Sequence, residues 1–431
     1  MKPITATIRG IVILLLLVPA ARTVAQENGV FTVKAQVRPR FEYNHGAQFP
    51  LGENDKPISF ISNRTRVSLG YENSIILLPT KENWDLSMGI SGQDISIWGQ
   101  KPQVDNAANV TLNEAWAKLH KNGFFAQIGR QSLSYDDDRI LGTLDWHQAG
   151  RWHDALRLGY ENDRHTLHAI IAYNQTPQSP GDGTFYKGGQ PYKTMQTAYY
   201  QFHNDVWKAS ALLMNLGFQH GDAENPKVHY LQTMGTHIVY TPGALSLTGS
   251  FYYQTGKTAA DAHIGAYLFA AKAQYAFAPL FSAAVGVDYL SGNNTDEDNY
   301  TAFNPLYGTH HKFYGSMDYF YASAYPDYGL ADVYASFIFK PVKKLTTDIT
   351  YHYFSAQQPI RVNDTDRKAL GSEIDLTVTY PVLPYVTLQG GFSVMFGTDA
   401  FFQAKGGSSN RTQHWTFLSL NINPTLFSSR K

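Results

Sequence analysis

The residues most suited to chemistry in this 431-residue chain are arginines gathered in its first third. Eight of the fifteen arginines lie within residues 31–157. A guanidinium group stays charged at physiological pH and binds a carboxylate or phosphate through two parallel hydrogen bonds, and rings of such groups line pores that pass anions. The candidate lining residues, with the lysine and acidic residues near them, are Lys34, Arg38, Arg40, Glu42, Arg64, Arg66, Glu114, Arg130, Arg139, Asp154 and Arg157.

A second candidate site is the segment 292–328, which holds ten aromatic residues. A connection of this length is rarely an idle turn. Its aromatic and polar composition suits sugar rings, or a loop that folds inward as a constriction. A surface loop packed on its own aromatics is the alternative. The candidate constriction residues are Tyr307, His310, Lys312 and Asp318.

Metal and catalytic chemistry have weaker signals. Asp136, Asp137 and Asp138 could ligate a hard cation, but they lack the interleaved spacing and glycine of a calcium loop. We therefore expect no metal and no cofactor. Ser419 and His414 stand five residues apart on a predicted strand, hence on opposite faces, and the chain has no G-x-S-x-G elbow. The sequence does not indicate an enzyme.

Composition narrows the protein class. The chain has no cysteine, which excludes disulfide scaffolds and thiolate-ligated metals. Its formal net charge is zero, whereas a nucleic-acid-binding protein needs a basic surplus, so we expect no nucleic-acid partner. Hydrophobic residues make up 43%, which argues against disorder, and charged residues only 16%, below the roughly 25% of soluble domains.

The N-terminus predicts export. Lys2 and Arg9 precede the apolar run 11–18, and Thr23-Val24-Ala25 forms a small-residue cleavage site. This pattern is typical of a cleaved signal peptide. We predict a signal peptide at 1–25 and a single domain at 26–431.

β-Strands, along which side chains alternate between two faces, must position the candidate residues. Within 31–43 apolar side chains alternate with polar ones, which is typical of a strand with one greasy and one polar face. No later apolar run reaches the length of a spanning helix. Eighteen such strands are predicted, at 31–44, 60–72, 84–98, 110–120, 124–134, 151–160, 165–174, 194–203, 206–218, 228–240, 245–256, 263–277, 281–291, 329–340, 344–356, 370–380, 385–397 and 411–422.

The connections between these strands alternate in length. The long ones are 45–59, 99–109, 135–150, 175–193, 292–328, 357–369 and 398–410; only 73–83 breaks the scheme. Outer-membrane barrels show this alternation, with short periplasmic turns and long extracellular loops. We predict an all-β fold, a single closed antiparallel transmembrane β-barrel of about 18 strands in the bacterial outer membrane. Its surroundings would be outer-membrane lipid and lipopolysaccharide.

Eighteen strands enclose an aqueous lumen, so the polar strand faces should line it. These charges could form an anion-selective element, or they could merely solvate a wide lumen. Arg130 is a difficulty, because strict alternation sends it toward lipid. Gly129 beside it could host a β-bulge that turns it inward.

The chain resembles the alginate export family of outer-membrane barrels over nearly its whole mature length. No single tripeptide is diagnostic, but the order and spacing of the matching stretches are fairly specific. They are Arg38–Tyr43, Arg64–Arg66, Gln93-Asp94, Trp98-Gly99, Asn113–Ala115, Gly129–Gln131, Asp138–Gly142, Asp145-Trp146, Asp154 with Arg157, Ser291-Gly292, Phe303–Asp318, Leu370-Gly371 and Glu373–Asp375.

The resemblance implies an eighteen-stranded barrel with an arginine-rich constriction that passes an anionic uronic-acid polysaccharide outward. Periplasmic export or uptake components are expected partners. Two departures bear on this: the chain ends Phe427–Lys431 without the terminal aromatic of many such barrels, and its net charge is zero. A general or uptake porin for small anions or oligosaccharides remains an alternative, as do a rim-sited hydrolase and an adhesin.

Overall fold

The computed structural model describes residues 29–77, 82–104, 109–176, 185–186, 188–295 and 299–430. The predicted signal peptide at 1–25 lies outside these residues. The strands are β1 (Val30–His45), β2 (Ile58–Leu77), β3 (Glu82–Ile97), β4 (Thr111–Lys121), β5 (Phe124–Gln131), β6 (His153–Glu161), β7 (His165–Tyr173), β8 (Thr194–His203), β9 (Trp207–Gly221), β10 (Pro226–Tyr240), β11 (Leu245–Lys257), β12 (His263–Ala278), β13 (Phe281–Leu290), β14 (Leu330–Phe339), β15 (Thr346–Val362), β16 (Thr365–Leu383), β17 (Val386–Gly397), β18 (Gln413–Ile422) and β19 (Thr425–Ser428).

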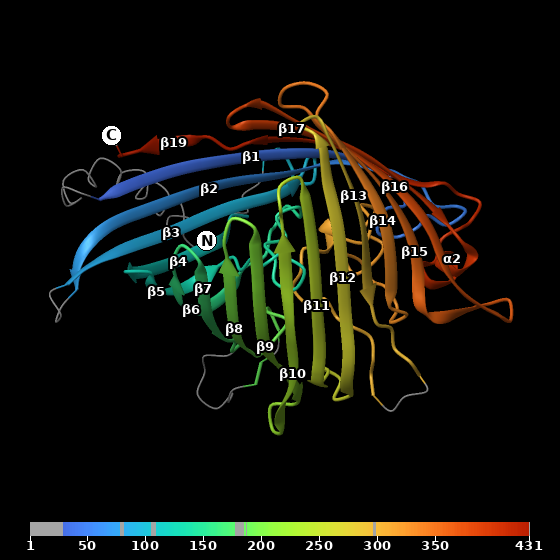
Figure 1. Ribbon diagram of the computed structural model, residues 1–431, viewed down its shortest axis with the longest axis horizontal. Helices are drawn as coiled ribbons and strands as arrows, with labels where there is room; N and C mark the ends of the chain where they lie inside the picture. The colour runs from blue at the N-terminus through green and yellow to red at the C-terminus, as the bar shows by residue number, and fades with distance from the viewer. Residues whose placement is uncertain are drawn as a thin grey trace.

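The sheet closes on itself. Every strand from β2 to β17 pairs antiparallel with its neighbours in sequence, and β1 pairs with β2 on one side and β18 on the other. The predicted eighteen-stranded barrel is therefore confirmed. The short extra strand β19 pairs with β1 beyond the end of β18. Figure 1 shows the strong twist of the sheet, with β1–β3 running almost at right angles to β10–β13.

The two faces of the sheet differ as the alternation predicts. Large apolar side chains are exposed on the outer face, where a bilayer would surround them. In the described chain no helix has the length and apolar character of a membrane span. Outward-facing examples are Val67, Ile90, Ile128, Leu158, Ile171, Leu213, Phe251, Phe269, Val285 and Val333.

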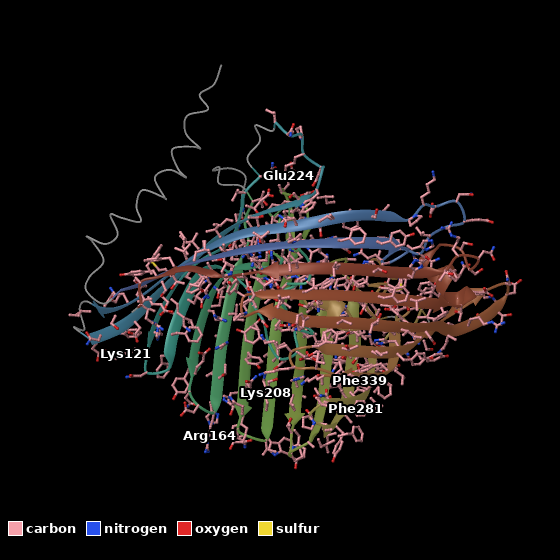
Figure 2. All side chains as sticks on the ribbon, turned by 90° about the horizontal axis from the view of Figure 1, so that it is seen from above. Lys121, Arg164, Lys208, Glu224, Phe281 and Phe339 are labelled. Carbon is pink, nitrogen blue, oxygen red and sulfur yellow. The ribbon has the colours of Figure 1, made fainter. Side chains whose placement is uncertain are left out.

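Short turns gather at the end of the barrel where both terminal strands lie, here called the terminal end. Figure 2 labels Lys121, Arg164 and Lys208 along this rim, with Phe281 and Phe339 beside them. The Asn122-Gly123 turn has positive φ at both residues, 51° and 85°, the geometry of the tightest hairpin. The longer loops lie at the opposite end, here called the loop end.

Three predicted boundaries were wrong. The connection 73–83 is not long, because β2 continues to Leu77 and β3 begins at Glu82. The connection 357–369 is a tight hairpin between β15 and β16. Its tip, Asn363-Asp364, adopts positive φ at both positions, 44° and 61°, which the two residue types tolerate. Finally, β5 ends at Gln131 rather than 134, since the chain there leaves the wall for the lumen.

Two long connections fold inward and fill part of the lumen. We call residues 132–152 inner loop A, and residues 291–295 with 299–329 inner loop B; the latter contains a 3₁₀ turn, η1 (His310–Lys312). Apolar residues of both loops are fully buried, among them Leu141 and Met317. The loops contact each other through a parallel bridge between Leu141 and Tyr307. The surface-loop alternative for 292–328 is therefore wrong.

The loop end carries one further element. Helix α2 (Asp399–Lys405) follows β17, with Thr398 as its N-cap. Its Phe401 packs against Tyr319 of inner loop B, with ring centroids 4.8 Å apart. The Tyr319 hydroxyl in turn donates to the Gly46 carbonyl at the end of β1, at 2.7 Å. These contacts tie three loops together around the mouth of the barrel.

Candidate functional site: an arginine wall and two inner loops

Four arginines of β1 and β2 form one patch on the inner face, which we call the arginine wall: Arg38, Arg40, Arg64 and Arg66. The strand register places Arg38 directly opposite Arg64, and Arg66 two residues further along β2. Two like charges directly opposite each other repel, so the patch needs nearby acceptors. The register gives these four side chains the same parity on two neighbouring strands, as alternation predicts.

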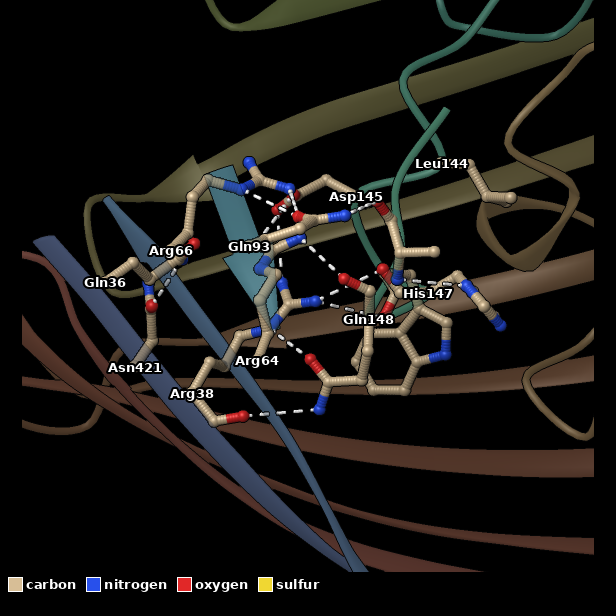
Figure 3. A network of polar contacts seen from close by, with 12 residues as sticks. Gln36, Arg38, Arg64, Arg66, Gln93, Leu144, Asp145, His147, Gln148 and Asn421 are labelled. Atoms are coloured by element: carbon tan, nitrogen blue, oxygen red, sulfur yellow. Dashed lines mark hydrogen bonds and ion pairs between the residues drawn. The ribbon is translucent and has the colours of Figure 1, made fainter. Parts of the chain in front are cut away.

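Inner loop A supplies one of those acceptors. The Asp145 carboxylate accepts from Arg38 at 3.2 Å and from Arg64 at 2.8 Å. Arg38 also donates to the Gln148 side-chain oxygen at 3.0 Å, and Arg64 to the Gln148 carbonyl at 3.3 Å (Figure 3). Two arginines of the wall therefore hold the loop, and their side chains are covered by it, with exposed fractions of 11% for Arg38 and 1% for Arg64.

The other two arginines have different partners. Arg40 pairs with Glu42 at 2.9 Å, and its guanidinium carbon lies 4.3 Å from the Trp146 ring centroid. Arg66 is held by neutral oxygens, from Gln93 at 2.6 and 2.9 Å and from Asn113 at 3.2 Å (Figure 3).

The wall therefore keeps a positive surplus. Four guanidinium groups face two bonded carboxylates, Glu42 and Asp145, which leaves an excess of two positive charges. Arg66 contributes most directly to this excess, because no carboxylate bonds to it among the described residues.

Titratable groups of inner loop A respond to this surplus. Partial desolvation raises the pKa of the Asp145 carboxyl, but the Arg64 and Arg38 guanidinium groups outweigh it and hold the pKa below its usual range. Burial lowers the pKa of His147, and Arg40 and Arg38 lower it further. At neutral pH the loop thus presents an ionised Asp145 and a neutral His147 to the wall.

Arg130 and Asp154 were wrongly assigned to the lumen. The β4–β5 register shows no shift at Gly129, although its φ is +121°, so no bulge turns Arg130 inward. Arg130 keeps the parity of outward-facing Ile128 and pairs with Asp154 at 3.0 and 3.1 Å. Its guanidinium also lies 3.5 Å from the Trp152 ring centroid. The Asp154 carboxylate neutralises the charge of Arg130, and the Trp152 ring covers its guanidinium group, so the arginine can lie on the outer face.

Arg139 and the acidic triplet lie inside the barrel but do not form an open lining. Arg139 is buried, with ion pairs to Asp137 at 3.2 Å and to Asp288 of β13 at 3.1 Å. Asp136 accepts from the Tyr199 hydroxyl at 2.8 Å, and Asp138 pairs with Lys312. In the described parts of the chain, no group of three His, Asp or Glu side chains is arranged to hold a metal.

The four candidates of inner loop B all lie inside the barrel and fasten the loops. Tyr307 packs against Tyr192, which lies just before β8, with ring centroids 5.5 Å apart. His310 Nδ1 lies 2.8 Å from the Tyr321 carbonyl, and Asp318 bonds His311 at 2.8 Å. Lys312 joins the two loops through Asp138.

The remaining lining candidates face the lumen nearer the terminal end. Lys34 is exposed on the inner face of β1. Glu114 accepts from the Ser132 amide at 3.0 Å and from its hydroxyl at 2.5 Å. Arg157 donates to the Gln127 side-chain oxygen at 2.7 Å.

Sequence reasoning missed an acidic surface, the acidic wall, on the inner face of β13–β16. His352 bridges two of its carboxylates, Asp332 at 2.9 Å and Asp375 at 3.5 Å. The surface borders a cavity of about 450 Å³ whose lining includes Lys312 and Tyr314 of inner loop B. The alternation of side chains along the strands in the second half of the chain would have shown this acidic surface. Its members are Asp288, Asp332, Asp348, Glu373 and Asp375.

A second cavity lies against the arginine wall toward the loop end. It measures about 610 Å³, and its lining includes Arg40, Trp146 and Arg151. Trp146 stacks on His311 with centroids 4.1 Å apart, so both inner loops contribute to its floor. The lumen thus combines a cationic surface, an anionic surface and two loops between them.

Comparisons with known proteins agree with this architecture. A family model described as alginate export matches residues 30–414. A search of curated proteins finds no match.

Solved structures share the fold at low identity. OccAB4 of Acinetobacter baumannii has a TM-score of 0.64 at 11% identity, with 93% of this chain and 99% of that chain covered. OpdK of Pseudomonas aeruginosa, solved with vanillate, has a TM-score of 0.61 at 10% identity, with 91% and 98% covered. OccK11 of Pseudomonas aeruginosa has a TM-score of 0.59 at 12% identity, with 93% and 96% covered.

Proposed function

The chain belongs to the alginate export family, and from that premise we propose that it passes an anionic polysaccharide, or related anionic solutes, along the arginine wall of its lumen. The family and the fold are those of outer-membrane transport channels rather than enzymes. Long loops at one end and short turns at the other support an orientation with both termini in the periplasm. Lipid and lipopolysaccharide would surround the barrel.

One observation carries this proposal: the positive surplus of the arginine wall. A uronate polymer has a carboxylate on each sugar, and guanidinium groups on neighbouring strands offer successive sites for them. Each contact must release its carboxylate for transport to continue, which favours several modest sites over one tight one. The neutral partners of Arg66 suit such exchange, because no bonded carboxylate competes for it.

Ion selectivity tests the proposal. Purified protein in planar bilayers should show a stable conductance and, in a potassium chloride gradient at low salt, a reversal potential that favours chloride. Arg66→Gln should weaken this preference, and higher salt should weaken it too, since the screening length is only about 8 Å at 0.15 M. The double change Arg64→Ala, Arg66→Ala should weaken it further, although Arg64 also anchors inner loop A.

Arg164→Gln is the matched control, because Arg164 lies on the terminal rim outside the lumen (Figure 2). It should leave the reversal potential unchanged. If Arg66→Gln behaves like this control, the arginine wall is lumen lining without a selective role.

Uptake of small anions is a second candidate function. The inner loops narrow the lumen, and the similar fold of OpdK was solved with vanillate, a small carboxylate. Blockade of the current by a hexamer of mannuronate would favour the polymer. Free passage of benzoate without any blockade by the hexamer would favour the small-anion alternative. The concentration gradient would set the direction of this passive flow, with periplasmic export or uptake components as the proposed partners.

A further inference from the structure

We propose that Trp116 of β4 is a platform for one sugar ring of the transported polymer, with Lys34 and Lys118 placed for the carboxylates above and below it. This inference rests on the proposed function and adds a carbohydrate site nearer the terminal end than the arginine wall.

The Trp116 indole lies flat against the inner wall. The register places it opposite Gly89 of β3. A Cβ built on Gly89 would lie only 2.7 Å from Cε2 and Cζ2 of the indole and 3.0 Å from its Nε1. A side chain at position 89 would therefore lift the ring, so the glycine and the flat orientation belong together.

Glycines on the neighbouring strands leave space at the inner surface on both sides of the Trp116 ring. On one side the row continues through Gly89 to Gly70 of β2, and on the other side Trp116 pairs with Gly129 of β5. The result is a shallow groove of about 250 Å³ whose lining includes Thr32, Ser68 and Trp116.

The Trp116 side chain is partly exposed on the inner face. Other inward aromatics that cover glycines are themselves covered: Phe417 over Gly391 packs against Trp146. Trp116 makes no ring stacking or cation–π contact with another described side chain. A flat, partly exposed indole offers an apolar face and a polar N–H edge to a ligand that has both kinds of surface.

Cations, hydroxyls and the carboxylates of Glu72 and Glu114 lie around the platform. Lys34 of β1 pairs with Ser68 of β2. It lies two residues nearer the loop end than Thr32, which connects to Trp116 through the pairs Thr32–Gly70, Gly70–Gly89 and Gly89–Trp116. Lys34 forms no ion pair among the described residues. Lys118 stands two residues further along β4, opposite Ser87, a rise of about 6.8 Å. Its ammonium is held 4.1 Å from the Phe125 centroid.

This chemistry fits a uronate. The C–H face of a pyranose ring packs on the negative π face of an aromatic ring, while its rim presents hydroxyls and a carboxylate. Lysine can also hold a moving carboxylate, since it binds as a point charge without fixed bidentate geometry. A ring on Trp116 with its neighbours near Lys34 and Lys118 would form one modest site in series with the arginine wall.

Single-channel recording with two probes tests the platform. Hexamannuronate and neutral maltohexaose should each interrupt the current of the wild-type channel. Trp116→Leu keeps Gly89 covered but removes the flat face, and should shorten the residence time of both probes about 3- to 10-fold. Trp116→Phe should restore most of it. Lys34→Gln should shorten the residence of hexamannuronate alone.

Trp207→Ala is the control, because Trp207 is an exposed indole on the outer face and should leave both residence times unchanged. Equal residence times in the wild type and Trp116→Leu would overturn the platform while leaving the proposed function intact. A wild-type channel with neither anion preference nor blockade by hexamannuronate would overturn both. Since Trp116→Phe preserves an aromatic ring, its rescue separates loss of stacking from loss of fold.

Discussion

At the scale of single residues, Asp145 decides how much of the arginine wall is free. Its carboxylate bonds both Arg38 and Arg64, yet its side chain stays 60% exposed to the lumen. Asp145→Asn removes one of the two carboxylates that face four guanidinium groups. We expect the ratio of chloride to potassium permeability to rise roughly twofold, the opposite direction from Arg66→Gln. Reversal potentials at low salt measure it, and an unchanged or lower ratio would contradict the assignment.

The ion pairs of Asp145 with Arg38 and Arg64 also predict how stability and selectivity respond to pH. The folded-state pKa of Asp145 lies below its ordinary value of 3.8, so its ion pairs contribute stability above that value and lose it as the pH falls through the folded pKa. Between pH 7 and pH 5 the Asp145 pairs should therefore contribute no change in selectivity. Below about pH 3.8 the ion selectivity of the wild type should approach that of Asp145→Asn. A wild-type selectivity that moves away from that of the variant on acidification would contradict the role of Asp145.

Sequence reasoning reached the arginine wall but not its partners. Alternation alone placed Arg38, Arg40, Arg64 and Arg66 on one face, because neighbouring strands share parity. It could not show that Asp145 would return to bond Arg64 and Arg38 from a loop 81 and 107 residues further along the chain. It failed at Arg130 because a glycine was taken as a bulge, whereas the outer face holds Arg130 against Asp154.

At the scale of elements, the inner loops depend on a few buried anchors. Arg139 of inner loop A and Asp288 of β13 are both nearly inaccessible to solvent. Arg139→Gln leaves the buried Asp288 carboxylate without its ion pair and should cost about 3–5 kcal/mol. Asp288→Asn should cost less, because Asp137 still pairs with Arg139, and the double change should cost clearly less than the sum of the two. Thermal unfolding in detergent gives the energies, and additive losses would show that the two residues are not coupled.

The elements themselves were largely predictable from period-two patterning. What failed was the length of connections, since composition does not reveal backbone dihedrals. The segment 357–369 resembled a polar loop, yet Asn363-Asp364 turns within two residues and both strands extend to it. The inward path of 132–152 was also invisible, because a lumen-filling loop and a surface loop can share one composition.

At the scale of the whole molecule, closure of the barrel gives a simple test. Detergent-extracted protein should show a circular dichroism spectrum dominated by β-structure, because in the described chain the helices are only η1 and α2. Unheated protein should migrate faster in sodium dodecyl sulfate gels than boiled protein. A mainly helical spectrum, or a soluble monomer without detergent, would contradict the fold.

The seam between β1 and the last two strands has a consequence for biogenesis. Val37 pairs with Ile422 and Val33 with Phe427, so the first strand finds half its partners only when the last residues arrive. Such contacts between distant parts of the chain make folding slow, and until closure both terminal strands expose unpaired backbone edges that invite aggregation. The newly exported polypeptide is therefore open to aggregation until this seam closes, and a chain that ends before Thr425 would leave β1 partly open at its first residues.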